Sequence, residues 1–253
     1  MISEDSDLYR KHPDWAVRIP GQEHALGRNQ MVLDLTREEV RNYIIESMSD
    51  VFSRGKVDYV KWDMNRNLSD YYSQGLAPRH QGEFGHRYIL GLYQVIQTLT
   101  DRFPHILFEA CASGGNRFDL GMLCFMPQIW ASDNTDAISR ARIQNSYSYG
   151  YPQSVIAAHV SGCPNHQTLR RTPLTSRFAI ASVGILGYEC NLNDASMEDM
   201  EEIRAEIELY KKWRSVLQFG DWYRLYEEVD KKSIYDTDVI RWNIVSADKS
   251  RAV

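Results

Sequence analysis

The chain has 253 residues and a mass of 29.4 kDa, enough for one large domain or two small ones with a buried core. Apolar residues make up 43% and charged residues 25%, and 29 basic against 34 acidic side chains give a net charge of −5. This composition excludes disordered and collagen-like chains, and the lack of a basic stripe predicts no nucleic-acid partner.

Short apolar runs alternate with longer amphipathic stretches, a pattern that predicts alternating strands and helices. The expected strands are, in chain order, residues 31–35, 57–63, 106–111, 127–133, 154–160 and 185–192. The first expected helix begins at a capping box over Thr36 to Glu39, and the next two span residues 83–103 and 139–149. A further helix starts near Pro173, and the last one follows Ser196 and continues to residue 217. Two last strands, 221–228 and 239–245, have no helix between them.

Strands separated by helices imply a parallel sheet with crossover connections, either an open doubly wound sheet or part of an eight-stranded barrel. No glycine-rich phosphate loop follows the first strand, as a dinucleotide-binding sheet would need. Polar residues end nearly every strand, and in a (β/α)8 TIM barrel those ends converge on one active site. The sequence therefore predicts such a barrel, incomplete at its N-terminal side by about two β/α units. We expect the partial barrel over residues 1–218 and the beginning of a small antiparallel β-domain over 219–253.

The first candidate for chemistry is Asp63, at the end of an expected strand, with Lys61 two residues before it on the same face. A carboxylate beside a cation is a plausible ionised nucleophile. An aspartate at a strand end can equally cap the following turn, and the sequence leaves both interpretations open.

The second candidate is Asp133, which follows another expected strand 133 − 63 = 70 residues later. It too could simply cap the next helix. Two carboxylates at strand ends, flanked by aromatic residues, match the needs of glycoside hydrolysis, where one attacks and the other carries a proton. We expect Lys61 beside Asp63 and the Trp130 ring beside Asp133 to favour opposite protonation states in the two carboxyl groups.

Between these aspartates lies Cys111-Ala112-Ser113-Gly114-Gly115, in which glycine allows backbone amides to approach a ligand or simply makes a tight turn. Cys111 could be a thiol nucleophile, but no general-base histidine is evident beside it, so a small buried residue is the better interpretation. His159, His166 and Asp133 could be metal ligands, but their spacing matches no metal motif, so we expect no metal site.

Cysteine usage and hydropathy bear on location. Cys111, Cys124, Cys163 and Cys190 have no CxxC spacing, which indicates free thiols rather than a zinc site. Residues 1–11 are polar and charged, unlike a secretory signal, so we expect a cytoplasmic protein. No apolar run reaches about 18 residues, so we expect no membrane span and no membrane partner.

Five motifs together resemble glycoside hydrolase family 36, and the similarity runs from about Asp5 to Leu225. They are Gly27-Arg28-Asn29-Gln30, Lys61-Trp62-Asp63-Met64-Asn65-Arg66, Cys111 to Phe118, Trp130 to Ala137, and His159 to Gln167. The resemblance implies a (β/α)8 barrel, with Asp63 as nucleophile and Asp133 as acid/base. It also implies substrate binding by Arg28, Lys61, Asn65, Cys111 and Gly114. One departure is Asn134, where many members have a second aspartate.

The resemblance further implies retaining hydrolysis of terminal α-galactosides such as melibiose and raffinose-type oligosaccharides, with no cofactor and no metal. The full-length protein is then expected to be a homo-oligomer. The family's N-terminal β-supersandwich and the residues that recognise the galactose 4- and 6-hydroxyls have no counterpart in these 253 residues. Two alternatives stay open: a raffinose-type galactosyltransferase, and an inactive fragment that only binds sugar.

Overall fold

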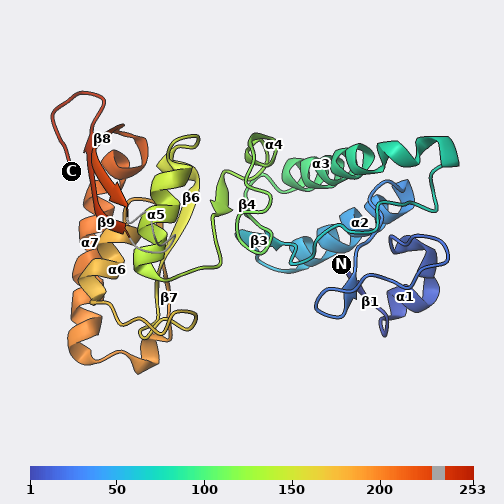
Figure 1. Cartoon of the computed structure of the whole chain (residues 1–253), viewed down its shortest axis with the longest axis horizontal. Helices are drawn as coiled ribbons and strands as arrows, with labels where there is room; N and C mark the ends of the chain where they lie inside the picture. The colour runs from blue at the N-terminus through green and yellow to red at the C-terminus, as the bar shows by residue number, and fades with distance from the viewer. Residues whose placement is uncertain (230–236) are drawn as a thin grey trace. The chain divides into compact units, whose positions relative to one another are not determined.

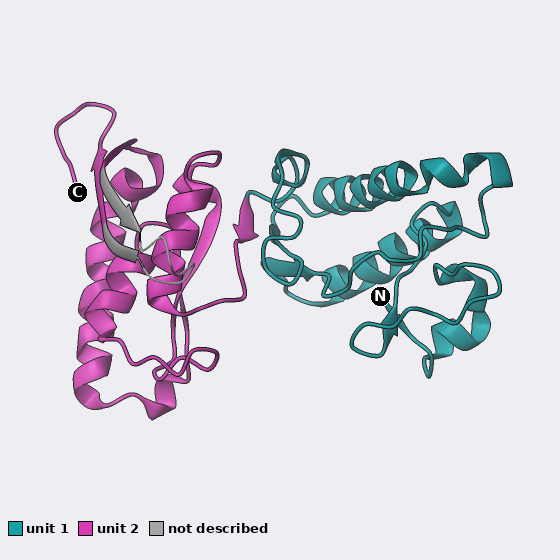
Figure 2. Ribbon diagram, viewed as in Figure 1, with its two compact units in different colours: residues 1–127 teal, residues 128–253 magenta. Residues whose placement is uncertain are grey.

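A computed structural model of the chain describes residues 1–229 and 237–253. The chain divides into two compact units, Met1–Pro127 and Gln128–Val253 (Figure 2). Each unit contains parallel strands joined by helices, and each is described here by itself (Figure 1). Across the described ranges, no helix combines the length and the apolar character needed to cross a membrane.

The first unit contains a β–α–β element that carries half of the candidate residues. Its helices and strands are β1 (Ile2–Ser3), α1 (Asp7–Lys11), β2 (Gln30–Met31), α2 (Glu38–Arg54), β3 (Tyr59–Asp63), α3 (Phe84–Arg102), β4 (Leu107–Cys111) and α4 (Leu120–Leu123). Strands β3 and β4 pair in parallel, with Lys61 opposite Glu109 and Asp63 opposite Cys111. Helix α3 connects them and buries Leu92, Ile96 and Leu99, the apolar stripe that the sequence predicts.

Two expectations for the start of this unit are wrong. The strand expected over 31–35 is only two residues long in the structure, and it pairs antiparallel with β1 instead of joining a parallel sheet. The residues after it bond to the segment around Trp15, since the Asp34 N–H donates to the Trp15 carbonyl oxygen at 2.8 Å. The capping box at Thr36 is also absent, because the Thr36 hydroxyl donates to Asp34 instead and Arg37 occupies the N-cap of α2.

The second unit continues the alternation of strands and helices and ends in a hairpin. Its elements are β5 (Gln128–Trp130), α5 (Ala137–Tyr147), β6 (Ile156–Ser161), α6 (Leu174–Ala181), β7 (Ile185–Glu189), α7 (Met197–Phe219), β8 (Asp221–Val229) and β9 (Thr237–Val245). Strand β6 pairs in parallel with both β5 and β7, whereas β8 and β9 are antiparallel. Helix α7 ends at Phe219 and β8 begins at Asp221, but the expected domain boundary near residue 218 stays a prediction.

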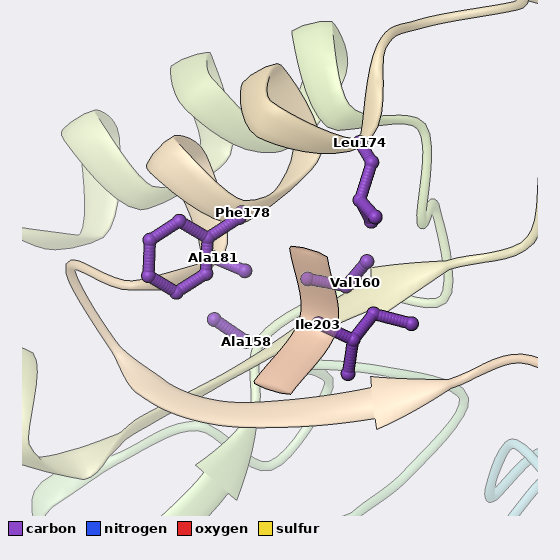
Figure 3. Close-up of a cluster of buried hydrophobic side chains, with 6 residues drawn as sticks. All are labelled: Ala158, Val160, Leu174, Phe178, Ala181 and Ile203. Atoms are coloured by element: carbon purple, nitrogen blue, oxygen red, sulfur yellow. The ribbon is translucent and has the colours of Figure 1, made fainter. Parts of the chain in front are cut away.

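The core of the second unit determines which way β6 faces. Ala158 and Val160 of β6 are fully buried against α6 and α7, in the cluster of Ala158, Val160, Leu174, Phe178, Ala181 and Ile203 (Figure 3). Because side chains alternate along a strand, His159 and Ser161 project from the opposite face of β6. Packing of the small residues under α6 therefore points the polar residues of β6 away from the helices.

Candidate active site

In the first unit, the side chains of β3 and β4 form a ladder on one face of the pair. Tyr59, Lys61 and Asp63 occupy alternate positions of β3, and the residues opposite them on β4 are Leu107, Glu109 and Cys111. In a (β/α)8 barrel such inward-facing side chains fill the interior in layers, and the layer at the carboxyl ends of the strands faces the substrate. Asp63 and Cys111 form that last layer, as the sequence predicts.

The Asp63 carboxylate is exposed and is held by side chains. The Asn65 amide donates to Asp63 Oδ2 with Nδ2 at 2.6 Å, and the Cys111 thiol lies in hydrogen-bonding contact with the carboxylate. The turn that follows β3 is stabilised by the backbone of β4, because the Met64 N–H donates to the Cys111 carbonyl oxygen at 3.1 Å. Asp63 is thus in contact with Asn65 and Cys111, while the backbone hydrogen bond of the following turn is to the Cys111 carbonyl oxygen.

The turn after β4 is tight and also approaches Asp63. Ser113 and Gly114 both have positive φ, +49° and +79°, and glycine is the residue that adopts this conformation at least cost. The Ser113 N–H donates to Asn65 Oδ1 at 3.1 Å, so the Asn65 amide connects this turn to the candidate nucleophile. Arg117 stabilises both strand ends, since it donates to the carbonyl oxygens of Cys111 (2.6 Å) and Trp62 (3.3 Å).

Cys111 is a protonated, structural thiol. Burial raises its pKa to about 11, a hydrogen bond with the Gly114 backbone opposes this shift, and the Asp63 carboxylate adds to it. Thiolates, not thiols, are the nucleophiles of cysteine enzymes. The raised pKa therefore supports the interpretation of Cys111 as a small buried residue, 4% exposed, that contacts Asp63.

Arg28 lies at the tip of a two-residue hairpin turn. Gly27 and Gln30 exchange backbone hydrogen bonds of 3.0–3.1 Å, and Arg28 and Asn29 have φ values of +54° and +58°. The Arg66 guanidinium connects this hairpin to the loop after β3, because it donates to the carbonyl oxygens of Gln30 (3.2 Å) and Ala25. Arg28 itself is exposed, and the structure places its hairpin beside the loop that carries Asp63 and Asn65.

Lys61 has a partner that the sequence interpretation missed. Its ammonium nitrogen lies 3.4 Å from Glu109 Oε1, across the parallel pair, so the expected pairing with Asp63 alone is incomplete. The Tyr59 hydroxyl donates to the other Glu109 oxygen. A charged residue inside the apolar run Leu107-Phe108-Glu109-Ala110-Cys111 was the available signal, because Glu109 and Lys61 each precede a strand end by two residues.

In the second unit, Asp133 follows β5 and accepts a hydrogen bond from Trp130. The Trp130 indole Nε1 lies 3.0 Å from Asp133 Oδ1, so Trp130 lies beside this carboxyl group as expected but contributes a hydrogen bond rather than an apolar surface. The geometry differs because Trp130 turns its polar edge toward Asp133 while its ring face packs elsewhere. The N-cap of α5 is Asp136, whose carboxylate accepts from the Ser139 N–H at 3.0 Å, so Asp133 is not the cap.

The Trp130 ring packs against His159 and Arg140. The His159 ring stacks on it with centroids 4.3 Å apart, and the Arg140 guanidinium carbon lies 4.5 Å from its centroid. His159 Nδ1 in turn lies 2.8 Å from Glu189 Oε2. Burial lowers the pKa of Arg140 to about 10, which leaves it charged at neutral pH. These contacts fix the orientation of the indole that donates to Asp133.

The metal hypothesis for His159, His166 and Asp133 gains no support. Within the described part of the chain, no three His, Cys, Asp or Glu side chains are grouped so that they could hold a metal ion. The nearest polar neighbours of His159 and Asp133 are instead Glu189 and Trp130. The structure thus places Asp63, Lys61, Asn65, Cys111 and Gly114 together in the first unit, with the Arg28 hairpin tied to them, and Asp133 in the second unit.

A parallel barrel segment with polar residues at its strand ends is an arrangement that many enzymes share, and comparison with known proteins identifies the family. The Melibiase family model matches residues 1–220, and the chain belongs to that family. Alpha-galactosidase 1 of Pediococcus pentosaceus and AgaA of Geobacillus stearothermophilus are each 47% identical to it over all 253 residues. The chain spans about a third (34%) of the length of these relatives.

Solved structures show the same relationship in three dimensions. The crystal structure of the family 36 α-galactosidase AgaA from Geobacillus stearothermophilus matches 99% of this chain, with a TM-score of 0.92 and 46% identity over 34% of its own length. The α-galactosidase of Lactobacillus brevis matches 99% of the chain with a TM-score of 0.94, over 33% of its own length. These matches confirm the predicted fold class, a partial TIM barrel followed by antiparallel strands, and the resemblance to family 36.

Proposed function

We propose that the protein is a retaining α-galactosidase, with Asp63 as nucleophile and Asp133 as acid/base. The observation that carries this proposal is the position of the two aspartates. Asp63 is the last residue of β3, and Asp133 follows β5 after an interval of 133 − 63 = 70 residues. Both strands are parallel strands of a barrel segment, in which strand ends supply the catalytic residues.

Two complexes of the Geobacillus enzyme support the same pair. The complex with raffinose carries an Asp→Asn substitution and the complex with stachyose an Asp→Ala substitution, each beside an Ala→Glu change. The two substituted aspartates are 70 positions apart, as Asp63 and Asp133 are here (133 − 63 = 70). A third complex, with 1-deoxygalactonojirimycin, keeps both aspartates and carries the Ala→Glu change alone. Loss of one aspartate in each oligosaccharide complex is what we expect if both are needed for cleavage.

Each aspartate has a contact that orients its carboxyl group for its proposed role. Asp63 attacks the anomeric carbon as the glycosidic bond breaks, and Asp133 transfers its proton to the leaving oxygen. Asp133 then takes a proton from water, which attacks the same carbon and releases Asp63 with net retention. The Asn65 amide holds the Asp63 carboxylate, and the Trp130 N–H holds that of Asp133. This double displacement uses two carboxyl groups and needs no cofactor.

The residues of the first unit that we propose to bind the substrate lie on or beside the same pair of strands, β3 and β4. We propose that Lys61, Asn65, Cys111, Gly114 and Arg28 contact the terminal galactosyl group, because all five lie on β3, on β4 or on the segments hydrogen-bonded to their ends. Lys61 lies two residues before Asp63 on the same face of β3, which supports a role for its ammonium in binding a sugar above Asp63. We propose melibiose and raffinose-type oligosaccharides as substrates of the intact protein, meaning the whole product of the gene that encodes this chain.

The stereochemical course of the reaction tests the proposal. Proton NMR of melibiose hydrolysis by the intact protein should show α-galactose as the first product, followed by slow mutarotation to the β-anomer. First release of β-galactose would rule out a retaining mechanism. Hydrolysis should also persist at high sucrose concentration, whereas galactosyl transfer to sucrose as the main reaction would favour the transferase alternative.

We further propose a cytoplasmic homo-oligomer. The four cysteines Cys111, Cys124, Cys163 and Cys190 are all free, which suits a reducing compartment. The net charge of −5 without a basic stripe argues against a nucleic-acid partner. Cell fractionation with a specific antibody tests the location, and light scattering of the purified intact protein tests the oligomeric state.

A further inference from the structure

A buried carboxylate lies one layer beneath the candidate nucleophile. Glu109, in the middle of β4, is 1% exposed and lies opposite Lys61 on β3. Its Oε1 is 3.4 Å from the Lys61 ammonium, and its Oε2 accepts a hydrogen bond from the Tyr59 hydroxyl. Burying a carboxylate is costly unless charge and hydrogen bonds compensate it, so this site needs an explanation.

The ladder gives the Lys61 ammonium two carboxylates within reach. Asp63 follows Lys61 by two residues on the same face of β3, about 6.6 Å along the strand. Glu109 lies directly opposite on the neighbouring strand, and both Asp63 and Lys61 act electrostatically on the Cys111 thiol between them. An ammonium drawn fully onto Asp63 would block the attacking oxygen and move the Lys61 charge away from the buried Glu109 carboxylate.

From this geometry we infer that Glu109 is a positioning residue, which, granted the proposed function, holds the Lys61 ammonium so that the Asp63 carboxylate stays free to attack the sugar. Tyr59 helps to hold the Glu109 carboxylate in place by donating a hydrogen bond to its second oxygen. Burial and the hydrogen bond to Glu109 raise the pKa of the Tyr59 phenol, so Tyr59 remains a donor at every working pH. The set Tyr59, Glu109 and Lys61 thus forms a support under the Asp63–Cys111 layer.

A second tyrosine–glutamate pair in the chain provides a matched control. Tyr188 of β7 donates to Glu206 Oε2 of α7 at 2.7 Å, and Glu206 is 6% exposed. This pair resembles Tyr59–Glu109 in chemistry and in the burial of its glutamate, but it joins β7 to α7 within the second unit. Glu206→Gln therefore reports the general effect of neutralising a buried glutamate.

The test compares Glu109→Gln, Glu109→Asp and Glu206→Gln in the intact protein, by pH profiles of kcat/KM for melibiose hydrolysis. Glu109→Gln should lower kcat/KM by about 10- to 100-fold, the range found when a partner that orients an active-site group is removed. The acidic limb of the profile should move to lower pH, because the loss of one negative charge and the transfer of Lys61 to Asp63 both favour the ionised nucleophile. Glu109→Asp should restore most of the activity and the position of the limb.

The outcomes separate this inference from the proposed function. An active wild-type protein whose Glu109→Gln variant keeps the acidic limb in place, or loses no more activity than Glu206→Gln, would overturn the inference alone. A wild-type protein inactive toward every α-galactoside would overturn the proposed function and the inference with it. If Glu109→Gln does not fold, Tyr59→Phe serves instead, because it removes the donor to Glu109 at a side chain that is 45% exposed. Tyr59→Phe should then lower kcat/KM, and an unchanged value would count against the support.

Discussion

Asn65 Nδ2 lies 2.6 Å from Asp63 Oδ2, while the oxygen of the same amide accepts a hydrogen bond from the Ser113 N–H. One side chain thus joins the end of β3 to the turn after β4. The amide fixes the direction of the Asp63 carboxylate and shares its negative charge through a strong, charge-assisted hydrogen bond. Orientation of the attacking group within a few tenths of an ångström is a large part of enzymatic rate enhancement.

Replacing this amide should therefore slow the reaction without unfolding the protein. We expect Asn65→Ala to lower kcat/KM for melibiose by about 10- to 100-fold, since the carboxylate loses the partner that orients it. Asn65→Asp should be worse, because it places a like charge beside Asp63. Steady-state kinetics and thermal unfolding measure the two effects. The exposed neighbour Asn67, changed to alanine, serves as the control, and an equal effect at both positions would contradict the role of Asn65.

The two aspartates should differ in how their loss depends on the substrate. Asp63→Asn should abolish turnover of every α-galactoside, because no nucleophile remains. Asp133→Asn should slow melibiose far more than an aryl galactoside with an acidic phenol as leaving group, since only melibiose needs the proton. Initial rates on the two substrates give the comparison. Equal, small losses for both variants would contradict the assignment of the two aspartates as nucleophile and acid/base.

Alkylation of Cys111 should depend on pH in an unusual way. Because its pKa is raised to about 11, the thiolate population keeps increasing up to that pH. Iodoacetamide labelling of Cys111, followed by mass spectrometry, should therefore increase continuously from pH 7 to pH 10. Asp63→Asn should increase the labelling at each pH, because the Asp63 carboxylate contributes to the raised pKa. A plateau below pH 9 in the wild-type protein would contradict this assignment, and labelling of exposed Cys124 controls for reagent activity.

The Glu206 carboxyl group should make stability depend on pH. Its burial raises its pKa in the folded state above the value of an unfolded chain, so its protonated form is the one that the fold favours. Stability from this group is fully present below the unfolded value near 4.5 and is lost as pH increases through the folded value. Urea unfolding should show Glu206→Gln gaining stability relative to wild type between pH 4 and pH 7. A difference that is constant over this range would contradict the raised pKa.

The 253-residue chain expressed alone should be a poor catalyst. It covers 34% of the length of its α-galactosidase relatives, and the resemblance to family 36 implies that residues recognising the galactose 4- and 6-hydroxyls lie outside it. Contacts remote from the reacting atoms contribute to turnover as well as to affinity, and positioning can be worth about 7–11 kcal/mol of the barrier. Melibiose hydrolysis by the purified chain at an ordinary rate of about 10 per second would contradict this expectation.

Much of the fold could be predicted from the sequence because the ends of the strands are marked by characteristic residues. Asp63 and Cys111 end β3 and β4 as expected, since a polar or small residue closes each apolar run. The predictions of the capping box at Thr36 and of the strand over 31–35 were wrong because these residues form hydrogen bonds that sequence spacing does not reveal. Thr36 bonds to Asp34 rather than to its own helix, and the segment after β2 pairs with residues near Trp15.

The positions of Asp63 and Cys111 at strand ends could be predicted from the sequence, but the contacts of the candidate residues could not. Lys61, Glu109 and Tyr59 meet only through the register of two parallel strands, which no single run of sequence shows. Trp130 presents its N–H to Asp133 while its ring packs against His159 and Arg140, and these come from other elements. Rotamers set by such packing are the part of an active site that periodicity and motif spacing leave undetermined.

The stem of Arg66 passes directly beneath the hairpin that carries Arg28. A Cβ added at Gly27 would lie 2.6 Å from Arg66 Cδ, closer than two carbon atoms can approach. Positions 27 and 66 are therefore constrained as a pair: among homologous proteins, a side chain at position 27 should be found only where position 66 is short. The two motifs that contain these residues are 39 positions apart (66 − 27 = 39), yet they should change together during evolution.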